Sequence, residues 1–101
     1  MPSSEEYLNF ILEQLSDLNN VTYRAMMGEF LLYYNNKLVG GIYDDRLLIK
    51  PIKKVKEYMT NIHYEKPYEG AKEMLLVDNV DDKEYLNKIF DILYDNLPNK
   101  K

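Results

Sequence analysis

Four short runs rich in β-branched, aromatic and leucine residues follow one another between residues 21 and 50. The pairs Asn35-Asn36 and Asp44-Asp45 separate three of these runs, and both residue types tolerate the positive φ of a tight hairpin turn. Gly28 separates the first two runs, and glycine also tolerates a positive φ. This pattern predicts a meander of antiparallel strands. The four strands are expected at Val21 to Met27, Glu29 to Tyr34, Lys37 to Tyr43 and Arg46 to Ile49.

An amphipathic helix is expected before the meander. Ser3 and Glu6 stand at a capping-box spacing, and apolar residues then recur at helical intervals over Ser4 to Leu18. Asn19 and Asn20 indicate its end, because asparagine is a poor helix former that tolerates the left-handed conformation. The apolar residues of this predicted helix are Leu8, Ile11, Leu12, Leu15 and Leu18.

Two more helices and one more strand are predicted after the meander. Pro51 suits the first turn of a short helix over Ile52 to Met59, because its missing N–H is not needed there. Thr60 to Ala71 is interpreted as a loop, and Glu73 to Val77 as a strand. Asp81 and Glu84 repeat the capping-box spacing before a last helix that Pro98 ends. Its apolar face is Leu86, Ile89, Phe90, Leu93 and Leu97.

These elements predict an α+β fold with two layers, in which an antiparallel sheet of about five strands packs against helices. The element order is α-β-β-β-β-α-β-α. The length of 101 residues suits one domain spanning residues 1–101, with residues 98–101 as a flexible tail. Gly40-Gly41 lies inside a strand, which indicates a bulge or a close approach of a helix, with a ligand-approach site as the alternative.

The composition excludes several classes of function. Without cysteine the chain can form no disulfide, thiolate nucleophile or thiolate zinc site. A formal net charge of −4 gives no overall attraction to nucleic-acid phosphates or anionic membranes. The acidic N-terminus differs from a signal peptide, and no apolar run reaches the ~20 residues that span a bilayer. We therefore expect a cytoplasmic protein without a membrane role.

No catalytic or metal-binding set of residues can be assembled from the sequence. His63 is the only histidine, and no serine lies in a nucleophile-elbow pattern. Asp44 and Asp45 form one acidic pair, and a second acidic cluster precedes the last helix, but neither matches a calcium loop. Turn formation and helix capping explain these carboxylates. The second cluster consists of Asp78, Asp81 and Asp82. The sequence predicts neither an enzyme, nor a metal site, nor a cofactor.

One local basic feature occurs in the chain. Residues 21–56 contain seven basic and three acidic side chains. Helical spacing places Lys53 and Lys56 near one another and Lys54 on another side of the helix. This pattern indicates a solvent-exposed helix face rather than a helix that binds in a groove of DNA. Direct nucleic-acid binding is therefore not expected.

Three blocks of the sequence resemble one protein family. The block Tyr23 to Tyr34, read Tyr-Arg-Ala-Met-Met-Gly-Glu-Phe-Leu-Leu-Tyr-Tyr, resembles the signature that opens the TfoX (Sxy) N-terminal domain. The block Gly41 to Pro51 is similar to the hairpin and lysine-ending strand that follow it. Pro67 to Lys72 resembles the variant of small stand-alone members from Gram-positive bacteria. The resemblance covers nearly the whole chain and implies one antiparallel sheet covered by helices.

The resemblance also implies a function. Better-known family members regulate natural competence in bacteria together with a cyclic-AMP receptor transcription factor, and they carry a second, C-terminal domain. This chain ends at Lys101 and is expected to lack that domain. The expected function is a non-enzymatic regulatory module that contacts a protein partner, by resemblance the transcription machinery. The alternative is a small-molecule or anion-binding domain of unknown role, and both monomer and homodimer stay open.

The candidate site residues follow from the family's motif positions. Arg24, Arg46 and Lys50 fall on those positions and are hard to explain by core packing. With Tyr43 they form the candidate surface that faces a partner or an anion. The other motif positions are expected to serve the structure, and they are Met27, Gly28, Tyr33 and Asp45.

Overall fold

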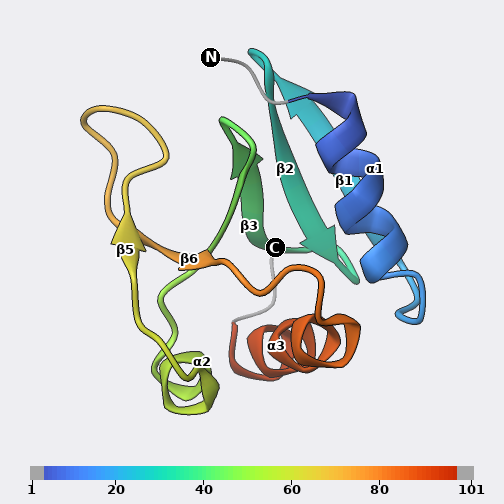
Figure 1. Cartoon of the computed structure of the whole chain (residues 1–101), viewed down its shortest axis with the longest axis vertical. Coiled ribbons are helices and arrows are strands. Elements are labelled where there is room, and N and C mark those ends of the chain that lie inside the picture. Colours follow the sequence, from blue (N-terminus) through green and yellow to red (C-terminus); the bar gives the residue numbers. More distant parts are fainter. Residues whose placement is uncertain (1–3, 98–101) are drawn as a thin grey trace.

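One antiparallel sheet of six strands organises the molecule, in the spatial order β1-β2-β3-β4-β6-β5 (Figure 1). The computed structural model describes residues 4–97. The strands are β1 (Val21–Met26), β2 (Glu29–Tyr34), β3 (Lys37–Tyr43), β4 (Arg46–Ile49), β5 (Tyr64–Glu65) and β6 (Met74–Val77). The helices are α1 (Glu5–Gln14), α2 (Lys53–Tyr58) and α3 (Lys83–Asn96).

Three two-residue turns connect the first four strands, and both residues of each turn have a positive φ. Two consecutive positive φ values define the primed turn whose twist matches that of paired strands. The predicted meander is confirmed, although β1 ends one residue early because Met27 belongs to the turn. The φ values are 53° and 84° for Met27 and Gly28, 50° and 69° for Asn35 and Asn36, and 54° and 55° for Asp44 and Asp45.

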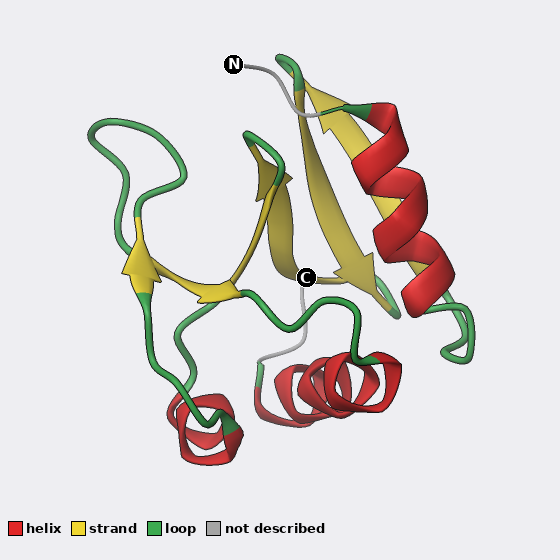
Figure 2. Cartoon of the chain, in the orientation of Figure 1, coloured by secondary structure: helices red, strands yellow, loops and turns green. Residues whose placement is uncertain are grey.

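The core lies between one face of the sheet and the helices (Figure 2). Side chains alternate between the two faces of a strand, so the strand residues of the core share one face, the helix-covered face. The predicted apolar face of α3 is buried throughout. The helix residues in the core are Leu8, Ile11, Val55, Leu86, Ile89, Phe90 and Leu93, joined by Leu15 directly after α1, and the strand residues are Phe30, Leu32, Tyr34, Val39, Ile42, Leu47, Ile49, Leu75 and Val77.

No helix among residues 4–97 packs against the opposite face, which we call the open face. Directly paired residues of neighbouring strands point to the same side. The register pairs Arg24 with Leu31, Leu31 with Gly41, and Gly41 with Leu48. These four residues therefore form one row across the open face. The rows on either side add Thr22, Met26, Glu29, Tyr33, Tyr43 and Arg46.

The helix ends differ in detail from the sequence prediction. Ser4 caps α1, because its Oγ accepts from the Tyr7 N–H at 3.1 Å; the predicted cap Ser3 lies outside the described residues. Tight turns follow Gln14, so the α-helix is shorter than the predicted Ser4 to Leu18. Asp82 rather than Asp81 caps α3, accepting from the Tyr85 N–H at 3.1 Å. The predicted tail, residues 98–101, also lies outside the described residues.

The α+β class and the two-layer order are confirmed, and a sixth strand is added. β5 lies within the segment interpreted as a loop, and it pairs Tyr64 with Leu75 and Glu65 with Met74. Two residues are too few for any periodic pattern. The second helix also shortens to α2, with Ile52 and Met59 as its caps. No helix among residues 4–97 is long and apolar enough to cross a membrane.

The glycine pair in β3 marks a bulge. The register shifts between Leu32 and Tyr33, which pair with Gly40 and Leu38, so Val39 is the extra residue. A Cβ on Gly40 would lie 2.2 Å from the Leu48 carbonyl oxygen, because the bulged backbone runs close to β4. The structural interpretation holds, with neighbouring strands rather than a helix making the close approach.

Candidate binding site on the open face

An apolar depression, which we call the methionine groove, lies on the open face at the tip of the β1–β2 hairpin. It has a volume of about 450 Å³. Three strands (β1, β2 and β3), the β1–β2 turn and the loop between β5 and β6 contribute its lining. The lining residues are Met26, Met27, Glu29, Leu31, Tyr43 and Tyr68.

Met27 is the most exposed large apolar residue of this groove. Its exposed fraction is 95%, and that of the adjacent Met26 is 49%. Met27 also adopts a φ of 53°, a region that bulky side chains rarely occupy. The first position of a primed turn is ordinarily Asn, Asp or Gly. In the other two hairpins of this meander it is Asn35 and Asp44. A methionine at this position therefore costs conformational energy without any gain from burial.

Tyr43 forms the floor of the groove. Its ring lies over Gly41, where a Cβ would come within 2.8 Å of the ring. The Tyr68 ring stands 6.5 Å from the Tyr43 ring, so the loop between β5 and β6 reaches the open face. Burial raises the pKa of the Tyr43 phenol, and the nearby Tyr68 and Glu29 raise it further. The phenol is therefore neutral at physiological pH and available as a hydrogen-bond donor.

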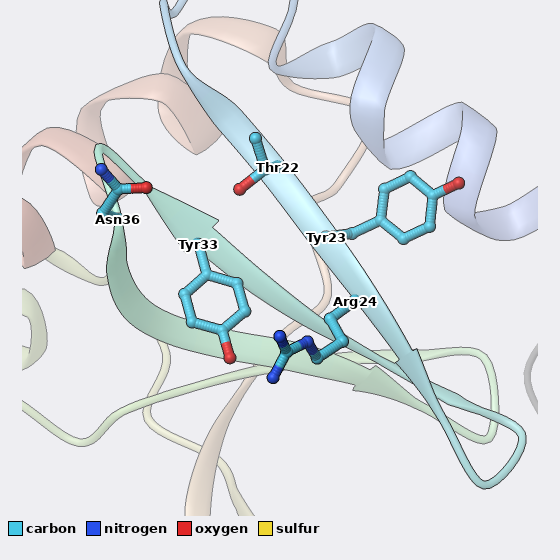
Figure 3. Close-up of a pocket in the computed structure, with 5 residues that line it drawn as sticks. All are labelled: Thr22, Tyr23, Arg24, Tyr33 and Asn36. Atoms are coloured by element: carbon cyan, nitrogen blue, oxygen red, sulfur yellow. The ribbon is translucent and has the colours of Figure 1, made fainter.

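A second depression, which we call the arginine hollow, lies beside the groove on β1 and β2 (Figure 3). It has a volume of about 410 Å³. Arg24 and Tyr33 extend side by side on the open face, whereas the Tyr23 ring points toward α1. Within residues 4–97 the Arg24 guanidinium makes no hydrogen bond or ion pair. The lining residues are Thr22, Tyr23, Arg24, Tyr33 and Asn36.

Arg46 connects β4 to the edge strand β5, on the side of the sheet away from β1. Its guanidinium pairs with the Glu65 carboxylate and donates to the Lys66 carbonyl at 3.4 Å, and its Nε donates to the Tyr43 carbonyl at 3.1 Å. These bonds fasten β5 and the following loop to β4. Arg46 and Glu65 are both partly buried, with 28% and 30% of the side chain exposed. The Arg46 side chain is thus engaged within the protein.

The four candidate residues do not come together in either of these two depressions. Arg24 lines the arginine hollow and Tyr43 the methionine groove, and neither depression includes Arg46 or Lys50 among its described residues. Lys50 follows β4 directly and donates its backbone N–H to the Val39 carbonyl at 3.1 Å. Arg24 lies on β1 and Arg46 three strands away on β4.

The acidic turn and the single histidine have structural partners. Asp45 Oδ1 accepts from the Ser4 N–H at 2.8 Å, which attaches the start of α1 to the β3–β4 turn. The Asp44 N–H donates to Glu29 Oε1 at 3.1 Å. His63 Nε2 lies 3.8 Å from Glu65 Oε2, and the His63 side chain is mostly exposed. These contacts agree with the turn interpretation of the acidic pair.

Sequence reasoning missed three apolar members of the groove. The sequence pattern predicts Met26 and Leu31 as strand residues and Tyr68 as a loop residue, and only the sheet register and the fold of the loop bring them together. One signal was present in the sequence. Met27 precedes Gly28 at a hairpin turn, where a large apolar side chain is out of place.

Comparisons with known proteins found a family and a relative. The family model described as the TfoX N-terminal domain matches residues 13–92, which contain all six strands and both depressions. The chain is also similar to a Spirochaeta aurantia protein described as an uncharacterized 12.7 kDa protein in the trpE 5′ region. The identity is 34% over 80 residues, covering 79% of this chain and 70% of that protein. No solved structure matches the chain.

Proposed function

This chain belongs to the TfoX N-terminal domain family, and on that premise we propose that it is a non-enzymatic regulatory module that binds a protein partner through the methionine groove. The observation that carries the proposal is Met27, a strained and almost fully exposed apolar residue at the rim of an apolar depression. Residues held in sparsely populated backbone conformations cluster at functional sites.

The composition of the groove suits a protein contact. Methionine adapts its shape to irregular apolar surfaces, and tyrosine combines a large apolar ring with a polar end. Both residue types are enriched in the buried centres of protein interfaces. The groove holds two methionines and two tyrosines beside a single carboxylate, Glu29. An apolar side chain of the partner would be desolvated there.

The family points to the transcription machinery as the source of the partner. A cyclic-AMP receptor transcription factor is the first candidate, and the contact would take place in the cytoplasm. The groove lies within the matched residues 13–92, so the proposal needs no further domain for this contact.

Replacing Met27 with Asn separates the proposed function from stability. Met27→Asn creates the Asn-Gly pair that a primed turn prefers, so the melting temperature should rise by a few degrees. Partner binding should fall about tenfold or more, as at an interface hot spot. The affinity of the purified transcription factor is measured by titration, and co-purified proteins are compared by quantitative mass spectrometry.

Ile62→Asn is the matched control, because Ile62 is 43% exposed and follows α2 in the chain, and α2 lies at the end of the molecule opposite the β1–β2 turn (Figure 1). It makes the same chemical change away from the groove. Wild type and Ile62→Asn should retain the same partners, and Met27→Asn should lose them. Equal binding by all three proteins would contradict the proposal.

A further inference from the structure

We propose that the partner binds as an extended segment that adds to the β1 edge of the sheet and carries an acidic side chain beside Arg24 and a large apolar side chain in the methionine groove. This inference rests on the proposed function and deepens it by defining the chemistry of the partner. β1 pairs only with β2 among the described residues, and five of its six residues are exposed. An edge of this kind is a template for another strand.

The hairpin geometry identifies which backbone groups of β1 face outward. The residues flanking a two-residue turn exchange hydrogen bonds with each other, and bonded pairs alternate with non-bonded pairs along the hairpin. The bond from the Asn35 N–H to the Asn20 carbonyl, at 3.0 Å, fits that alternation. The outward N–H and C=O groups therefore belong to the non-bonded positions, namely Val21, Tyr23 and Ala25.

The side chains of β1 set the pattern that a partner strand must match. Neighbouring strands lie about 4.8 Å apart, so residues of the added strand that point to the open face lie beside Thr22, Arg24 and Met26. Arg24 is the only charged residue on β1 and is unpaired within residues 4–97. A carboxylate beside it would complete an ion pair. Two positions along, next to Met26, an apolar side chain would enter the methionine groove.

A second copy of this chain fits the same edge poorly. Antiparallel pairing of two β1 strands with their helices on one side sets the two Arg24 residues opposite each other or two positions apart. β1 carries no acidic residue to neutralise them, and like charges at such positions are destabilising. The formal net charge of −4 on each copy adds long-range repulsion.

The test uses Ala25, whose N–H faces outward. Ala25→Pro removes that N–H and obstructs an incoming strand, yet leaves the bonds between β1 and β2 intact. Ala25→Thr is the matched control, because it keeps the N–H and favours a strand. The probe is a phage-displayed library of random twelve-residue peptides selected on the wild-type chain. Affinities of the selected peptides are then measured for each variant.

We expect the selected peptides to carry an acidic residue two positions from a large apolar one. They should bind Ala25→Thr within threefold of wild type and Ala25→Pro at least tenfold more weakly. Arg24→Gln should remove the preference for the acidic residue. Equal affinity of the peptides for wild type and Ala25→Pro would overturn strand addition. Loss of binding of the same peptides to Met27→Asn would then still support the methionine groove as the binding site. A dimer of the chain that Ala25→Pro abolishes would overturn the inference in favour of a second copy.

Hydrogen exchange gives a readout that does not depend on how well the proline variant folds. In the free wild-type chain the amides of Tyr23 and Ala25 should exchange fast, and those of Thr22 and Arg24 slowly. Bound peptide should slow the hydrogen exchange of the Tyr23 and Ala25 amides at least tenfold. Unchanged exchange at both amides with peptide bound would overturn the inference.

Discussion

The two edges of the sheet are built differently. At one edge β5 has two residues, and the pairing of Arg46 with Glu65 fastens it to β4. At the other edge β1 has six residues, and its charged side chain, Arg24, has no partner within residues 4–97. Proteins ordinarily shorten or cover a sheet edge to prevent unwanted pairing. The first edge follows that rule and the second does not.

The two arginines also differ in the contacts that they make. Both are candidate site residues from the sequence and both lie on the open face, so their sequence context alone does not distinguish them. Arg46 makes intramolecular bonds that hold a loop in place. Arg24 stands next to two depressions with its guanidinium unpaired in the described chain. Internal bonds hold the protected edge, and the unprotected edge is the one that we propose for binding.

The largest contrast is expected between apolar truncations near the two edges. Leu75, on the strand next to β5, is fully buried, so Leu75→Ala should lower the free energy of unfolding by about 2–5 kcal/mol. Met26→Ala on β1 should cost about 1 kcal/mol or less, because half of that side chain is exposed. Urea denaturation of both variants measures the difference. Similar losses would show that β1 is as tightly packed as β6.

Substituting the two arginines should give a smaller contrast. Arg46→Ala removes hydrogen bonds to a carboxylate and two carbonyls, and we expect a loss of about 1–2 kcal/mol after allowing for solvent screening. Arg24→Ala should change stability by no more than about 0.5 kcal/mol. The double variant Arg46→Ala with Glu65→Gln should lose less than the sum of the single variants. Equal losses for the two arginines would remove the distinction between the edges.

The smallest effect is a pH dependence at Tyr43, where the loop after β5 meets the groove. Its pKa is raised above the ordinary 10.0, so the folded state holds the phenol proton more tightly than the unfolded chain. That contribution is present below about pH 10 and is lost as the pH rises through the folded pKa. Urea titrations between pH 7 and 11 should show stability falling at alkaline pH, and less steeply in Tyr43→Phe. Identical slopes of stability against pH in wild type and Tyr43→Phe would contradict this prediction.

Much of the fold could be predicted from the sequence, because its signals are local. The pairs Asn35-Asn36 and Asp44-Asp45 prescribe tight turns, and the apolar face of α3 repeats at helical spacing. β5 could not be predicted, because Tyr64 and Glu65 become a strand only by pairing with β6. The exact helix caps also depend on side-chain geometry that sequence spacing leaves open.

The candidate site could be predicted only in part. Motif positions indicated Arg24, and the structure places it on the open face beside the arginine hollow. The same reasoning indicated Arg46, although its partner Glu65 comes from a strand that has no sequence signature. The methionine groove combines residues from β1, β2, β3 and a loop, and no spacing rule connects positions so far apart in the chain.

The three two-residue turns also bear on the order in which the molecule assembles. Every pairing from β1 to β4 joins neighbours along the chain, and such local contacts form fast because little loop entropy is lost. β6 reaches β4 only after α2 and the long segment that follows it. The rate-limiting step of folding should therefore be the docking of β6. The exposed edge then belongs to the early-forming half of the sheet, and the fastened edge is completed last.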